Sequence, residues 1–572
     1  MLAHRQQVLG NGSAWNLSVI LGLFGLIFGA CQGASPRDRP WREPIEVPNR
    51  ASPGEDGSDL GRSLAAEEHA GRLERRRERA LTLRIHLDSA PGSLNPMRSP
   101  SQWAKRIMLD NVFETLLRYR PLDGSGGDGT YQSGLAQRWD ISPGGREIRI
   151  MLHDNARWQD GKPVTALDVQ FSLEAAMTKR GGAAYHRAAL ADVAAVEIVN
   201  RAQVRLRLDR ANAFVLRELA SVPIMPEHIY RRALEQRNGP WLGSGPYRLS
   251  QDGVDLVLSR DPAYWGTAPA IEKVVFARHQ DAAVALREAK EGHMDVIPEL
   301  IREHYPEQLD IPGVAKNFSV FKIAPPELSY IVLHTKEAPF SDGNTRRAIA
   351  RLVDRTTLID QAGGLARGVP GLIWPGGPGN GAAAPVPEFN PDEAATLLDL
   401  AGWRDDDGDG VRSRDGQRLM ITVLATEGEN DARDLVLAAL RKSGFVIDLR
   451  VGNAAVLRNR LRDGEFDLAF VTWAGDVDRD LGPVLGSNGA ENYGRYESPV
   501  VDELLAKIQT AWNPADRKPL LATLGQLLGR SMPLIALPAP DPRGLVHKRV
   551  TGFSLWGGWF AIRELGLAED PE

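Results

Sequence analysis

The stretch FDLAFVTWAGD, from Phe466 to Asp476, carries an apolar run that ends on an aromatic ring and an acid. A short apolar run of this kind predicts a buried strand, which would place Trp473 and Asp476 at its carboxyl end. A carboxylate at the edge of a low-dielectric site is a natural partner for an ammonium group, and an indole can add a cation–π face. The alternative is a solvated acid in an ordinary turn.

A second acidic stretch, DDDGDGVRSRDG, runs from Asp405 to Gly416. Asp405, Asp407 and Asp409 have the spacing that opens a calcium loop. The twelfth position is Gly416, where an EF-hand needs a bidentate glutamate. We therefore interpret the stretch as an acidic turn before a strand at residue 419, with weak calcium binding as the alternative.

The residues needed for covalent chemistry do not group in the sequence. No two histidines have metal-ligand spacing, and neither a Gly-x-Ser-x-Gly elbow nor a Walker motif occurs. The formal net charge of -5 argues against nucleic-acid binding, and the basic run RLERRRERA is typical of a solvated linker or short helix. We predict no enzymatic activity, no cofactor, no assigned metal ligand and no nucleic-acid partner.

The lone cysteine, Cys31, directly follows the apolar segment NLSVILGLFGLIFGA. A short apolar region that ends in small residues is typical of a secretory signal, and Val19 to Ala30 is short for a membrane span. The residues FGAC resemble the lipobox of bacterial lipoproteins, in which the cysteine is lipid-modified, although Phe28 stands where leucine is usual. The alternatives are an uncleaved anchor or an ordinary export signal.

The remaining chain mixes strand and helix patterns from about Leu81 onward. LTLRIHL, REIRIML and QVRLRL alternate as strands, and TALDVQFSLEAAM predicts a helix capped by Thr165 with Asp168 three residues on. NTRRAIARLVDRTTLI predicts one helix with Asn344 as a possible cap. The alternation of strands and helices between 420 and 476, with helix ends at Gly444 and Gly464, predicts a mostly parallel sheet.

Several stretches in order resemble the family 5 extracellular solute-binding proteins, the oligopeptide and dipeptide receptors of ABC importers. They are LAQRWDISPGGREIRIMLHDNARWQDGKPVTALDVQFSLEAA, GSGPYRL with DPAYWG, EGHMDVI, PFSDGNTRRAIARLVDR, AATLLDLAGWRDDDGDGVR and MPLIALP. The resemblance spans roughly Leu81 to Gly558. It implies an α/β, two-lobed periplasmic-binding-protein fold, type II-like, with an additional domain. The resemblance also implies that the two lobes close around the ligand by hinge motion.

The expected organisation combines this resemblance with the N-terminal pattern. The ranges are a signal peptide at 1–31, a tether at 32–80, lobe I from 81–117, 223–325 and 536–572, an additional domain at 118–222, and lobe II at 326–535.

The resemblance also implies a ligand site. In peptide-binding members an aspartate after a tryptophan-containing strand pairs with the peptide ammonium, and TWAGD matches that position, so Asp476 and Trp473 are the expected ligand residues. ENYGRY matches the following segment and adds Asn492 and Tyr493. The sequence DVDRDLGPVL departs from the aromatic and proline that usually follow the aspartate.

The function implied is that of a monomeric, lipid-anchored envelope receptor that delivers short peptides to an ABC permease. Relatives also bind nickel complexes, haem, sugars or opines, so a non-peptide solute remains open. A sensor on the same fold and an envelope hydrolase are the rival classes.

Overall fold

The computed structural model describes most of the chain after the N-terminal region. The described residues are 69–71, 74, 76–99, 101–120, 130–236, 239–323, 327–369, 386–428, 430–474, 480–556 and 559–568. The chain divides into two units, Met1–His69 and Ala70–Glu572, and the second unit is described below. The expected signal segment, Cys31 and most of the expected tether lie outside the described residues.

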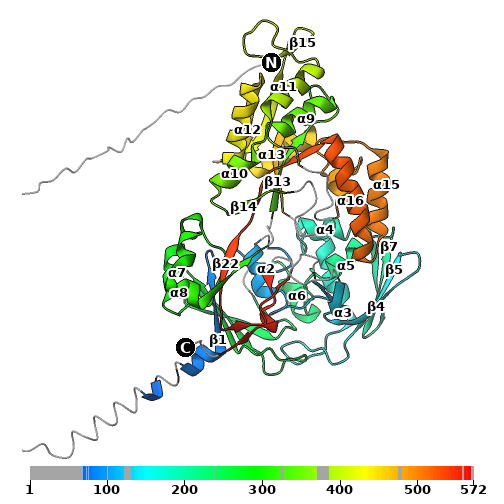
Figure 1. Ribbon diagram of the computed structural model, residues 1–572. Helices are drawn as coiled ribbons and strands as arrows, with labels where there is room; N and C mark the ends of the chain where they lie inside the picture. Colours follow the sequence, from blue (N-terminus) through cyan, green and yellow to red (C-terminus); the bar gives the residue numbers. More distant parts are fainter. Residues whose placement is uncertain are drawn as a thin grey trace, which may run out of the picture. The chain divides into compact units, whose positions relative to one another are not determined.

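A seven-stranded sheet forms the core of the region that we call lobe I (Figure 1). β1 runs parallel to β10 and β11, and its residues Leu83, Ile85 and Leu87 are fully buried. In sheet order the strands are β12 (Phe318–Lys322), β22 (Arg543–His547), β11 (Val296–Ile297), β1 (Thr82–Leu87), β10 (Lys273–Arg278), β9 (Asp255–Arg260) and β8 (Tyr247–Asp252).

Contacts with lobe I begin a few residues before the expected start at Leu81. Residues 76–81 are helical, and Glu78 pairs with Lys273 at 3.4 Å. The Arg79 guanidinium donates to the Gly292 carbonyl, and the Arg79 carbonyl accepts from Arg549 Nη1 at 2.8 Å. The end of the basic run is therefore a short helix that contacts the sheet.

A four-stranded antiparallel sheet occupies the range 118–222. Its strands, in sheet order, are β4 (Ala136–Ile141), β5 (Glu147–Leu152), β7 (Gln203–Leu208) and β6 (Val193–Asn200). Buried residues alternate along β5 and β7, which is typical of a sheet with one solvated face. Ile148 and Val204 belong to the same hydrophobic cluster as Leu83 and Ile85, so this sheet extends the core of lobe I.

Helix α3 (Ala166–Met177) covers this sheet and confirms the predicted capping box. Asp168 Oδ2 accepts from the Thr165 backbone N–H at 2.9 Å and from its hydroxyl at 2.8 Å. Asp168 Oδ1 accepts from the Glu227 N–H at 2.8 Å, so the buried carboxylate also holds the start of α6 (Glu227–Ala233). One side chain therefore fixes two helix starts.

Replacing Asp168 by Ala should lower the free energy of unfolding by about 2 kcal/mol or more, because a helix cap and a buried acceptor disappear together. Urea unfolding of the purified protein would measure this loss. Glu174, an exposed residue of the same helix, supplies the control, since Glu174→Ala should leave the midpoint nearly unchanged. Equal effects of the two changes would contradict the structural role of Asp168.

A five-stranded sheet forms the centre of lobe II. In sheet order its strands are β18 (Val446–Gly452), β17 (Met420–Thr426), β19 (Leu468–Ala474), β13 (Glu327–Leu333) and β20 (Leu534–Ala536). β17 is parallel to β18 and β19, whereas β13 is antiparallel to both of its neighbours. The prediction of a mostly parallel sheet between 420 and 476 is confirmed.

The helices between these strands also match the prediction. They are α12 (Asp431–Lys442) and α13 (Ala454–Asp463). Gly444 and Gly464 follow them with φ of +91° and +76°, the left-handed conformation that glycine adopts most easily.

The segment from 344 to 359 differs from the prediction of one helix. It forms α9 (Gly343–Arg351) and α10 (Arg355–Gln361), with a break between them. Asp342, and not Asn344, caps the first helix, because its carboxylate accepts from the Asn344 and Thr345 N–H groups. Asp354 caps the second through the Thr357 N–H, so the aspartate starts a new helix where the pattern suggested continuation.

Two crossovers connect the lobes, and the described strands on either side of them pair with neighbouring strands at the crossover ends. The first leads from β12 to β13, and the Glu327 end of β13 pairs with Ala474, the last residue of β19. The second leads from β20 through β21 (Ala539–Pro540) to β22, where Arg543 pairs with Lys322. The carbonyl of Arg543 accepts from the Leu300 N–H just beyond β11. The carboxyl edges of both sheets therefore flank the crossovers.

Candidate functional site

The carboxyl edges beside the crossovers are where an open α/β sheet binds ligands. Trp473, the predicted aromatic residue, is half-buried and is the second-last residue of β19. Its ring lies 5.2 Å from the Tyr330 ring at an interplanar angle of 54°. This contact holds the indole at the lobe II edge, beside the first crossover.

The other residues predicted around Trp473 have different outcomes. Asp476 lies in residues 475–479, outside the described residues, so its ammonium-binding role stays a prediction. Asn492 is buried, and its amide donates to the Gly486 carbonyl at 3.0 Å and the Tyr496 carbonyl at 2.7 Å. Tyr493 is buried in the hydrophobic cluster of lobe II. Asn492 therefore shapes its own loop, and a ligand contact of Asn492 or Tyr493 stays a prediction.

The lobe I edge carries a group of side chains that sequence reasoning missed. Asp88 directly follows β1, and Glu299 lies two residues after β11. Helix α2 (Gln102–Met108) contributes Trp103 and Arg106, and β25 (Trp559–Phe560) contributes Trp559. The position of Asp88 after a predicted strand was the one local signal, because the other members come together only through long-range folding.

Stacking holds the Arg106 side chain in this group. Its guanidinium carbon lies 4.1 Å from the Trp559 ring centroid and 5.3 Å from that of Trp103. The two indoles meet edge to face with centroids 5.5 Å apart, and Trp103 Nε1 donates to Asp88 Oδ1 at 2.6 Å. The aromatic pair therefore sets the plane of the guanidinium.

The charges of this group are partly withdrawn from water. Burial lowers the pKa of Arg106 to about 10, against the opposing influence of Glu299 and Asp88, so the side chain remains cationic at neutral pH. Partial burial raises the pKa of Glu299, which the positive charge of Arg106 counteracts. The arrangement can present a fixed, charged hydrogen-bond fork at the strand edge.

The acidic loop predicted at Asp405–Gly416 is an exposed turn. Carboxylate oxygens of Asp405, Asp407 and Asp409 lie within 4.8 Å of one another. Asp405 accepts from the Gly410 N–H, and Asp409 pairs with Arg418 at 2.7 Å. These contacts fit the interpretation as an acidic turn, and nothing in them assigns calcium.

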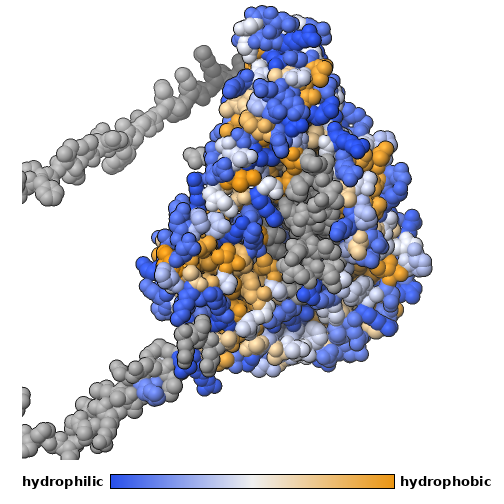
Figure 2. Space-filling model, viewed as in Figure 1, coloured by the Kyte–Doolittle hydropathy of each residue, from blue (hydrophilic) through white to orange (hydrophobic). Residues whose placement is uncertain are grey.

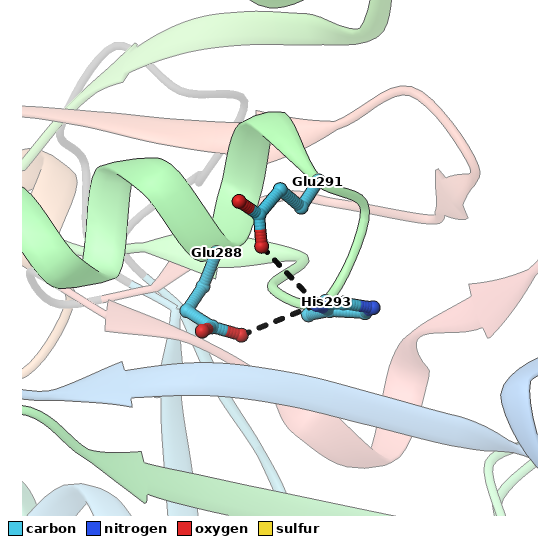
Figure 3. Close-up of side chains that lie close together, drawn as sticks. All are labelled: Glu288, Glu291 and His293. Carbon is cyan, nitrogen blue, oxygen red and sulfur yellow. Dashed lines mark ion pairs between the residues drawn. The ribbon is translucent and has the colours of Figure 1, made fainter. Parts of the chain in front are cut away.

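A second cluster of possible metal ligands lies at the end of α7 (Ala282–Lys290) and was not predicted. Figure 3 shows His293 between Glu288 and Glu291, with Nδ1 at 3.3 Å and 3.8 Å from their carboxylates. His293 and Glu291 are exposed. An ion pair at a helix carboxyl end accounts for this geometry.

Figure 2 shows polar residues over most of the visible face, with apolar residues in separate small groups. Within the described residues, no helix combines the length and apolar character needed to cross a membrane.

Residues 130–494 match the model of the bacterial extracellular solute-binding proteins, family 5. The chain belongs to this family. A curated relative of the family 5 protein is the probable di/tripeptide-binding protein 5 of Pseudomonas aeruginosa, 24% identical over 83% of this chain and 93% of the relative. The nickel-binding periplasmic protein of Escherichia coli is also 24% identical, over 75% of this chain and 83% of its own length.

Solved structures agree with the family 5 assignment. The oligopeptide-binding protein AppA of Bacillus subtilis, solved with a nonapeptide, has a TM-score of 0.65 at 19% identity over 85% of this chain and 99% of AppA. HbpA2 of Haemophilus parasuis has a TM-score of 0.72 at 20% identity over 85% of this chain and 100% of its own. The predicted α/β, two-lobed periplasmic-binding-protein fold is confirmed.

Proposed function

We propose that this protein is the substrate-binding component of an ABC importer and captures short peptides between its lobes. The observation that carries the proposal is the family 5 match, together with relatives that are described as peptide-binding proteins. An aromatic residue at each strand edge, Trp473 in lobe II and Trp559 in lobe I, suits a ligand with apolar parts and charged ends. Backbone polar groups would hold the peptide main chain, which tolerates many sequences.

The protein would act by binding alone. A hinge between the lobes closes on the ligand, and the closed form docks on a membrane permease whose separate subunit hydrolyses ATP. We further propose a monomer held to the envelope membrane by lipid on Cys31. Mass analysis of the mature N-terminus after export would detect the lipid, and Cys31→Ala should release the protein from the membrane fraction.

Native mass spectrometry of the body from Ala70 onward, purified without denaturation, tests the peptide proposal. A spread of bound masses that release short peptides would support a sequence-tolerant peptide receptor. A single sharp adduct would contradict it and favour a specific solute. The nickel-binding relative makes a metal complex the second candidate, and inclusion of a chelator in the purification would remove an adduct of that kind.

A further inference from the structure

The side chain of Arg106 is cationic, half-buried and held by stacking rather than by a counter-ion. In the described part of the chain its guanidinium forms cation–π contacts with Trp559 and Trp103, and no hydrogen bond or ion pair. Several half-buried arginines among the described residues do pair with an acid. Arg118 and Arg563, for example, both contact the fully buried Glu114. Arg106 differs from these pairs, because two indole rings hold its guanidinium and its N–H donors remain available for a partner outside the chain.

The stacked geometry leaves the hydrogen-bonding edge of the guanidinium available. Stacking occupies the faces of the planar group, whereas its N–H donors point outward in that plane. The indole Nε1–H of Trp559 is buried and also lacks a hydrogen-bond partner. The Arg106 guanidinium thus has unused donors at the carboxyl edge of lobe I, and donors without acceptors call for an anionic or carbonyl-bearing group.

Two acids near Arg106 affect which charge the ligand group can carry. Asp88 is occupied by the Trp103 indole N–H at 2.6 Å and by the Ser89 hydroxyl at 3.1 Å. Glu299 influences Arg106 only through space, since the two form no ion pair. Lys105, the preceding residue of α2, adds a second cation above the Tyr185 ring at 4.3 Å. The two acids and the two cations roughly balance in charge. The preference for a carboxylate therefore depends on how the guanidinium donors are oriented.

We infer that Arg106 binds a carboxylate of the ligand in a fork of charge-assisted hydrogen bonds, with the Trp559 ring holding the guanidinium in place. This inference rests on the proposed function and deepens it. Lobe I would then hold the carboxylate end of a short peptide. The ligand class would be zwitterionic peptides, and peptides amidated at the carboxyl end would bind poorly.

Calorimetry with alanine peptides of two to five residues, each as free acid and as carboxyl-terminal amide, tests this inference. The wild-type protein should prefer the acid roughly 10- to 100-fold. Arg106→Gln should reduce that preference to near unity by weakening the acid and sparing the amide, and Arg106→Lys should restore part of it. Lys105→Gln is the matched control, because it removes the same charge one residue away and should retain the preference.

The outcomes separate this inference from the proposed function. If the peptides bind but Arg106→Gln keeps the acid preference, or weakens acid and amide equally, the carboxylate role of Arg106 is overturned while peptide capture stands. If Lys105→Gln abolishes the preference as completely, general electrostatics replaces the proposed fork. If no peptide of the set binds the wild-type protein, both the peptide proposal and this inference fall. Unfolding midpoints of the variants confirm that each one is folded.

Discussion

Replacement of Asp295 by Asn should lower the free energy of unfolding by about 3–5 kcal/mol, because it strands a buried guanidinium. Asp295 Oδ1 accepts from Arg549 Nε and Asp295 Oδ2 from Arg549 Nη2, each at 2.7 Å, and both side chains are almost completely buried. Asp295 Oδ2 also accepts from the Arg84 N–H of β1 at 2.9 Å. Arg549 in turn donates to the Thr82 carbonyl at 2.8 Å.

This ion pair joins three segments that are remote in sequence: the start of β1, the approach to β11 and the end of β22. Its loss should therefore loosen lobe I as a whole, which hydrogen exchange at the β1 amides would report alongside urea unfolding. Glu503→Gln is the control, since Glu503 pairs with Lys507 at 2.7 Å on an exposed helix face. A midpoint for Asp295→Asn as close to wild type as that of Glu503→Gln would refute the structural role of the buried pair.

Replacement of Asp476 by Asn should weaken binding of peptides with a free amino end by about 30-fold or more, or ~2–5 kcal/mol. The proposed role of Asp476 is to neutralise the ligand ammonium, and an amide of equal size removes the charge while keeping the shape. The measurement is calorimetry with trialanine, with its amino-acetylated form as the second ligand. Binding of the acetylated peptide should be weak in both proteins and nearly equal.

Asp478→Asn provides the matched control for Asp476, because it removes the same charge two residues away. Wild-type affinity is expected for that variant. Unchanged affinity of Asp476→Asn for the free-amine peptide would exclude Asp476 as the ammonium partner. Because this experiment addresses the amino end and the Arg106 experiment addresses the carboxyl end, the two results are independent.

Lobe II shows how far local patterns carry a prediction. The strands and helices between 420 and 474 follow from alternation, helical periodicity and glycine at the helix ends, all of which act over a few residues. The prediction of one helix from 344 to 359 was wrong, because Asp354 accepts from the Thr357 N–H and caps a second helix. The apolar stripe alone does not reveal this cap. The family resemblance added the overall fold.

The site residues of lobe I could not be predicted from local sequence patterns. Arg106 and Trp559 are far apart in the sequence and meet only when α2 and β25 pack together. Nothing in the residues around Arg106 distinguishes it from the many arginines that lie in solvent. Asn492 was named from a motif position, and the structure adds that its side-chain amide donates to the Gly486 and Tyr496 carbonyls, so its ligand contact stays a prediction.

In the five-stranded sheet of lobe II, β13 is the one strand that runs antiparallel to the others, and this has a consequence for how the lobes are connected. Since β13 enters lobe II where β19 and β20 end, the chain enters and leaves that lobe on the same side. The first crossover begins next to the second, because the Ile323 N–H donates to the Pro542 carbonyl at 3.2 Å. The hinge motion proposed above would bend two adjacent connections about one common axis. The lobes should thus approach along a single reproducible arc, which brings the Trp473 edge back to the same register with Arg106 at every closure.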